Sequence, residues 1–148
     1  MTQRRPKPER VKAPPMVRKA KLEWRQASGQ RAHRDGHASE WIAAAWLMLH
    51  GYQILGFRLK GRAGEIDILA RRGRVLAVVE VKRRKTMEAA VAAITDDQYR
   101  RLLNAGRAVL HGRPSLAGHD LRIDMVALAP GRFPRHIPAI EPKGGWIG

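Results

Sequence analysis

The chain has 148 residues, the length of one domain with a buried core, so a second independent domain is not expected. Its 29 Lys and Arg against 13 Asp and Glu give a net charge of +16, which favours nucleic acid as a partner without choosing DNA over RNA. The absence of cysteine excludes disulfides and thiolate metal sites and suits a cytoplasmic protein. No apolar run reaches the roughly 18 residues of a membrane span, so we expect no membrane partner.

The composition divides the chain into three parts. Residues 1–34 are rich in Lys, Arg and Pro, and we expect a disordered basic arm that either raises affinity for nucleic acid or acts only as a solubilising tail. Residues 35–130 carry the regular patterns of a folded domain. Residues 131–148 contain Pro and Gly without a period, which predicts an extended segment on the surface.

A helix is predicted from Gly36 or Ala38 to His50, with Gly51 at its end. Apolar residues recur along it at spacings of three and four: Trp41, Ile42, Ala45, Trp46 and Leu49. We expect this stripe, including both tryptophans, to lie in the core rather than to form a platform for stacking bases.

Two apolar runs at residues 64–70 and 75–83 flank Gly73-Arg74, which predicts an antiparallel hairpin with a type II′ turn. This turn places Arg72 opposite Val75. Counting back from it predicts one wholly apolar face, made by the pairs Ile66/Val81, Ile68/Val79 and Ala70/Ala77. The other face carries Asp67 opposite Glu80 and Glu65 opposite Lys82.

Two carboxylates held opposite each other repel unless a proton or a cation lies between them. Oxygen ligands with several retained waters are what Mg²⁺ prefers, with Mn²⁺ as a substitute, so Asp67 and Glu80 are candidate metal ligands. Lys82 points to the same face as Glu80 and could hold a water beside the metal. The alternative is a solvated strand face with a cross-strand ion pair.

The remaining patterns predict a strand at residues 52–59, a basic turn at 60–64, helices at 87–94 and 95–110, and a strand at 121–129. Thr95-x-x-Gln98 fits a capping box at the start of the second of these helices. Gln98 therefore has two candidate roles, a helix cap and a contact near the scissile phosphate.

As a set, the motifs resemble the bacterial YraN-type endonuclease family of the PD-(D/E)xK superfamily, which is related to Holliday junction resolvases. The segments that carry the resemblance are Gly36-x-x-x-Glu40, Gly51-Tyr52-x-Ile54-Leu55, Gly64-Glu65-Ile66-Asp67, Glu80-Val81-Lys82 and Arg122-x-Asp124-x-Val126. The resemblance implies an α/β, restriction-endonuclease-like core in which a mixed central sheet is flanked by helices.

The resemblance also implies residue roles. Asp67, Glu80 and the carbonyl of Val81 would bind the metal, Lys82 would assist the water, and Glu40 would lie near the site as a further catalytic candidate. Gln98 stands where Lys is expected, and Arg58 stands where the family more often has Asn, which puts the substrate contacts in question. The candidate phosphate contacts are Arg58, Lys60, Arg62, Arg83 and Arg84.

The expected function is Mg²⁺-dependent hydrolysis of phosphodiester bonds in DNA by an endonuclease, with branched or junction DNA as a candidate substrate. A symmetric junction would suit a homodimer. One alternative is a non-catalytic nucleic-acid-binding or ribosome-associated protein on the same scaffold, because fold does not imply function. Another is a nuclease-fold enzyme that processes RNA.

Overall fold

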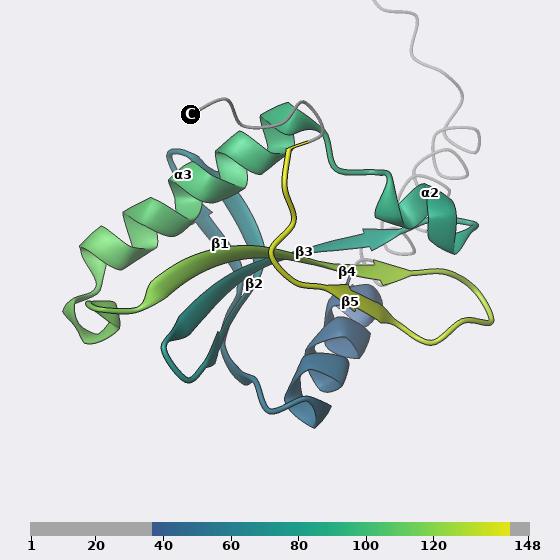
Figure 1. The fold of residues 1–148 in the computed structure, drawn as a ribbon, viewed down its shortest axis with the longest axis horizontal. Coiled ribbons are helices and arrows are strands. Elements are labelled where there is room, and N and C mark those ends of the chain that lie inside the picture. The colour runs from purple at the N-terminus through teal and green to yellow at the C-terminus, as the bar shows by residue number, and fades with distance from the viewer. Residues whose placement is uncertain (1–36, 143–148) are drawn as a thin grey trace, which may run out of the picture. The chain divides into compact units, whose positions relative to one another are not determined.

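The computed structural model describes residues 37–142, so the predicted basic arm at residues 1–34 lies outside the described residues. The described residues form a mixed sheet of five strands in the order β1-β2-β3-β4-β5 (Figure 1). Their bounds are β1 Gln53–Gly61, β2 Gly64–Arg72, β3 Val75–Arg83, β4 Asp120–Leu128 and β5 Arg135–Ile137. All neighbouring strands are antiparallel except β3 and β4, which are parallel. The predicted α/β class with a mixed sheet is confirmed.

Helices cover both faces of this sheet (Figure 1). The helix at residues 37–49 packs on one face, and α2, Met87–Val91, and α3, Asp96–Gly112, pack on the other. Gly106 lets α3 approach the sheet closely, because a Cβ there would lie 2.7 Å from Leu121 and 2.8 Å from Val78. Among the described residues, no helix has both the length and the apolar character that a membrane crossing requires.

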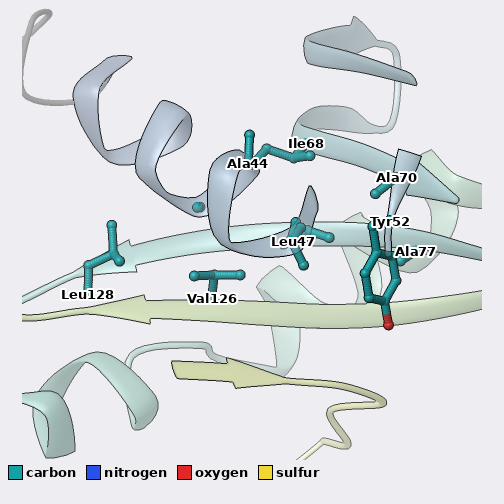
Figure 2. Packing of buried hydrophobic residues seen from close by; sticks show 10 residues of the cluster. Ala44, Leu47, Tyr52, Ile68, Ala70, Ala77, Val126 and Leu128 are labelled. Carbon is teal, nitrogen blue, oxygen red and sulfur yellow. The ribbon is translucent and has the colours of Figure 1, made fainter. Parts of the chain in front are cut away.

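The helix at residues 37–49 is rotated from the predicted orientation. Its buried positions are Ser39, Ala43, Ala44 and Leu47, and Figure 2 shows Ala44 and Leu47 packed with strand residues of the sheet. Trp41 is 65% exposed and Leu49 79% exposed, and Trp46 is only partly buried, so the expectation that the tryptophan stripe lies in the core was wrong. The small alanines bring the helix axis close to the sheet, which the bulky tryptophans would not allow.

The β2–β3 hairpin has the predicted register near its turn. Arg72 pairs with Val75, Ala70 with Ala77 and Ile68 with Val79, and Gly73 has the positive φ of +58° that the first turn position requires. The ladder ends at the pair Ile68/Val79. It therefore stops before the predicted pairs that involve the charged residues.

Between two neighbouring residue pairs of the β1–β2 ribbon, the apolar side chains change from one face of the sheet to the other. Phe57 and Ile68, which pair, pack towards the helix at residues 37–49, whereas Leu59 and Ile66, which also pair, pack towards α3. Regular alternation would put all four on one face, so the prediction that Ile66 shares a face with Ile68 and Val81 was wrong. Arg58, between the two pairs, has a φ of +46°, and this unusual backbone conformation marks the reversal.

Two further elements complete the described fold. Thr95 and Gln98 form the predicted capping box at the start of α3, with the Gln98 Oε1 atom accepting from the Thr95 amide at 3.1 Å and the Thr95 Oγ1 atom accepting from the Gln98 amide at 3.2 Å. Within the segment expected only to be extended, residues Arg135–Ile137 pair with β4 as the edge strand β5.

Candidate active site

Asp67 lies on β2 just beyond the last residue that pairs with β3. Its Oδ2 atom accepts a hydrogen bond from the Val81 amide at 2.9 Å, so the side chain takes the place of a backbone acceptor. In a β-strand the N–H and C=O of one residue point to the same edge. The carbonyl of Val81 therefore faces the same gap between β2 and β3 as the Asp67 carboxylate.

Glu80 and Lys82 are two residues apart on β3 and project from one face of it. The Lys82 Nζ atom lies 3.2 Å from the Glu80 Oε1 atom, and the two side chains are 11% and 16% exposed. The carboxyl groups of Asp67 and Glu80 lie close enough to influence each other's pKa. The two carboxyl groups and the ammonium thus meet in one partly open site at the end of the ladder.

The carboxyl pair resists full ionisation. Burial raises the pKa of Asp67 above its ordinary value, against the hydrogen bond from Val81. Burial and the charge of Asp67 raise the pKa of Glu80 to about 7, although Lys82 acts in the opposite direction. Without a cation, the raised pKa of Glu80 therefore favours a protonated carboxyl in this pair below about pH 7.

The donor set fits a hard divalent cation. It consists of two carboxylates and one main-chain carbonyl, all oxygen, and a cation would replace the proton as the compensating charge. The described residues contain no group of three or more His, Cys, Asp and Glu side chains placed to hold a metal. Water or a substrate oxygen would have to complete the coordination, as in the magnesium sites of phosphate-processing enzymes.

Glu40 forms an ion pair with Arg58, a residue of the strand next to the site. The Arg58 Nε atom lies 3.4 Å from the Glu40 Oε2 atom, and Arg58 occupies the β1 position beside Asp67. The ion pair joins the helix at residues 37–49 to the strand next to the site. The contact of Glu40 with Arg58 places it on this side of the site, and its proposed catalytic role stays a prediction.

The other predicted contacts lie on three different elements. Lys60 and Arg62 are exposed at the β1–β2 turn, and Arg83 and Arg84 are exposed after Lys82. The Arg84 guanidinium donates to the Arg83 carbonyl at 2.7 Å. Gln98 uses its Oε1 atom in the capping box, which leaves its amide nitrogen as the group for the predicted substrate contact.

A second polar cluster lies on β4, centred on the fully buried Asp124. Its carboxylate accepts two bonds from Arg122 at 2.7 Å, one from His136 at 2.8 Å and one from the Ala139 amide at 3.0 Å. Burial alone would raise the pKa of Asp124, but these hydrogen bonds outweigh it and lower the pKa. The Arg122 guanidinium also donates to the Tyr52 hydroxyl, a link that the sequence motifs did not indicate.

The four hydrogen bonds to the Asp124 carboxylate indicate that this cluster stabilises the fold. Its carboxylate oxygens are already occupied by protein groups, so it offers no free ligand to a metal. The cluster instead ties β5 and the following segment to β4. This agrees with leaving Asp124 out of the predicted ligand set.

The mixed sheet with helices on both faces, and with acidic and basic side chains where β2 leaves β3, places the protein among α/β domains with a nuclease-like core. Residues 39–128 match the model of the Uncharacterised protein family UPF0102, and the chain belongs to this family. The family predicted from the motifs is thereby confirmed.

Three relatives support this assignment. A UPF0102 protein of Caulobacter sp. strain K31 is 50% identical over 121 residues, which cover 82% of this chain and 87% of the relative. The UPF0102 protein amb4503 of Paramagnetospirillum magneticum is 50% identical over 113 residues, covering 74% and 88% of the two chains. UPF0102 protein R00337 of Rhizobium meliloti is 45% identical over 108 residues, covering 73% and 88%.

Proposed function

We propose that the protein is a Mg²⁺-dependent nuclease that hydrolyses phosphodiester bonds in DNA. The observation that carries this proposal is the part-buried carboxyl pair of Asp67 and Glu80, whose charges influence each other, with the Lys82 ammonium 3.2 Å from Glu80. A fold alone needs no such arrangement, because two partly buried acids at a break in a sheet destabilise the protein unless a cation or proton joins them.

Each group has a role in this reaction. Asp67, Glu80 and the Val81 carbonyl would hold the divalent ion, which when bound polarises a phosphate oxygen and lowers the pKa of water. The Val81 amide fixes the Asp67 carboxylate by its 2.9 Å hydrogen bond. Lys82 would orient the attacking water, and its buried stem limits the positions that its ammonium can take.

The surrounding charge supports a polyanionic substrate. Lys60 and Arg62 are exposed at the β1–β2 turn, and Arg83 and Arg84 are exposed at the end of β3, just after Lys82. Such groups position a phosphate backbone without reading its sequence. The net charge of +16 would also speed the encounter and make binding depend strongly on salt.

The direct test compares variants of the full chain on branched, duplex and single-stranded DNA with Mg²⁺ or Mn²⁺. We expect Asp67→Asn, Glu80→Gln and Lys82→Ala to lose at least about 100-fold in cleavage while they keep DNA binding within about threefold. Glu88→Gln and Lys85→Ala are matched controls, because both residues are exposed and lie outside the carboxyl site. Both controls should cleave as the wild type does.

Two results would redirect the proposal. A wild-type protein that binds all these DNAs but cleaves none, with either metal, would support a non-catalytic binding protein on this scaffold. Cleavage of structured RNA alone would assign the same site to RNA processing.

A further inference from the structure

A cleft of about 420 Å³ lies between the β1–β2 turn and α3, outside the carboxyl site. Its floor is apolar and is made by Leu59, Ile66, Ala105, Ala108 and Val109. The α3 contributors are spaced three and four residues apart, so they share one face of that helix. Small side chains at two of these positions leave the space open.

The rim of this cleft is cationic. Lys60, Arg62 and Arg113 line it, and no acidic side chain does. An apolar floor beneath several positive charges is complementary to a ligand that combines a flat apolar group with an attached anion. A nucleotide within a nucleic acid has this combination, because its base has two apolar faces and is attached to a charged sugar–phosphate backbone.

The cleft adjoins the carboxyl site through the chain itself. Leu59 and Ile66 pair across the β1–β2 ladder, and the next position along the ladder holds Arg58 and Asp67. Gly64, at the turn, is three residues from Asp67, a separation of about 10 Å at the usual rise of a strand. One nucleic-acid strand could therefore contact both places with nucleotides that are close in its sequence.

We propose that this cleft binds an unpaired nucleobase of the nucleic acid whose backbone lies across the carboxyl site. The inference rests on the proposed function and adds the substrate class: strands with unpaired or extruded nucleotides. A base stacked inside an intact duplex cannot enter the cleft, whereas one at a branch point, bulge or single-stranded end can.

The test measures binding without metal, so that it does not depend on cleavage. Fluorescence anisotropy of the full chain compares a single strand with a blunt duplex of the same sequence. Ala108→Phe fills the cleft from an exposed helical position. Ala45→Phe makes the same change at an exposed alanine of another helix, away from the cleft.

We expect Ala108→Phe to weaken binding of the single strand about tenfold, because it fills the space in which one base would be buried, and to change duplex binding less than about twofold. Ala45→Phe should leave both affinities within about twofold. Equal losses on both DNAs, or no loss on the single strand, would overturn the proposal. A change in oligomeric state by light scattering, with unchanged DNA affinity, would assign the cleft to a second copy and also overturn it.

A second measurement uses the wild type and therefore does not depend on the folding of a variant. A single strand carrying one 5-iodouracil is cross-linked by light, and the attached peptides are identified by mass spectrometry. Cross-links at residues 59–66 or 105–113 support the cleft, and cross-links only at other residues contradict it. A wild type that discriminates unpaired bases but cleaves no DNA would refute the nuclease while leaving this binding site in place.

Discussion

Asp67 takes the place of a strand partner for Val81. Its Oδ2 atom accepts the Val81 amide at 2.9 Å, at the point where the backbone ladder between β2 and β3 has ended. A carboxylate in this place fills a vacant acceptor position and also lies close enough to Glu80 to raise its pKa. The same hydrogen bond therefore serves the stability of the sheet and the orientation of the candidate metal ligand.

This double role separates two substitutions of Asp67. Asp67→Asn keeps an oxygen that can accept from Val81, and it removes a charge whose burial is unfavourable. Asp67→Ala leaves the part-buried Val81 amide without this acceptor, which costs about 1–3 kcal/mol. We expect urea unfolding to show Asp67→Ala less stable than Asp67→Asn by that amount, with both inactive. Equal stabilities would mean that the hydrogen bond contributes nothing measurable.

Glu80 should give the metal-free protein an unusual dependence on pH. Its pKa rises from 4.5 to about 7 on folding, because of burial and the charge of Asp67. The folded state then binds more protons than the unfolded state between these values, so this contribution to stability is present below pH 4.5 and is lost as pH rises to about 7. The test measures the unfolding free energy of the wild type and of Glu80→Gln at several pH values across this range. As pH rises towards 7, the unfolding free energy of the wild type should fall relative to that of Glu80→Gln. Towards pH 4.5, the difference that is due to the ionisation of Glu80 should disappear.

A divalent cation should oppose this effect. Because the ion and the proton compete for the same oxygens, Mn²⁺ affinity measured by calorimetry should increase with pH up to about 7 and then level off. Glu88→Gln, on the exposed start of α2, should leave the pH profile unchanged. A flat profile for the wild type would show that no proton is displaced.

Arg58 combines a departure from the family pattern with a strained backbone. Its φ of +46° is uncommon for residues with a side chain but is tolerated by Asn. We expect Arg58→Asn to keep the stability or raise it by up to about 1 kcal/mol, and Arg58→Val to lower it by more than about 1 kcal/mol, in urea unfolding. The reverse order of the two variants would contradict the strain.

Asp124 should be required for stability rather than for cleavage chemistry. Asp124→Ala leaves the Arg122 guanidinium and its other donors without their buried acceptor, and we expect a loss of about 3–5 kcal/mol. Asp97→Ala removes an exposed ion pair with Arg100 and should change stability by less than about 0.5 kcal/mol. Since the pKa of Asp124 is lowered, its contribution is present above pH 3.8 and is lost on further acidification. Wild-type-like thermal unfolding of Asp124→Ala would refute the assignment.

The central hairpin was predictable because two independent signals agreed on its register. Gly73-Arg74 specifies a tight turn, and the alternation of apolar and charged residues from Val79 to Lys82 favours one register at that turn. The register holds from Ile68 to Arg72 and leads Asp67 towards Glu80 and Lys82, although the predicted pairs of the charged residues do not form. The change of face in the β1–β2 ribbon was not predictable. Arginine rarely has a positive φ, and the hydrophobic pattern around Arg58 does not indicate one.

The orientation of the first helix was not predictable for a different reason. Residues 41–49 are all apolar, so spacings of three and four fit several faces equally well. The sheet selects the face with Ala43, Ala44 and Leu47, since small residues allow closer packing. The strand β5 was missed because three residues are too few to show a period.

The parallel pairing of β3 with β4 has a consequence for synthesis on the ribosome. Asp67 and Glu80 belong to one local hairpin, which can form as soon as Arg83 has left the exit tunnel. The edge of β3 that faces β4 stays unpaired until residues 120–128 arrive, after both α2 and α3 have been made. During that interval the nascent chain presents an open, apolar strand edge, and this is the stage at which overexpressed protein would be most exposed to aggregation.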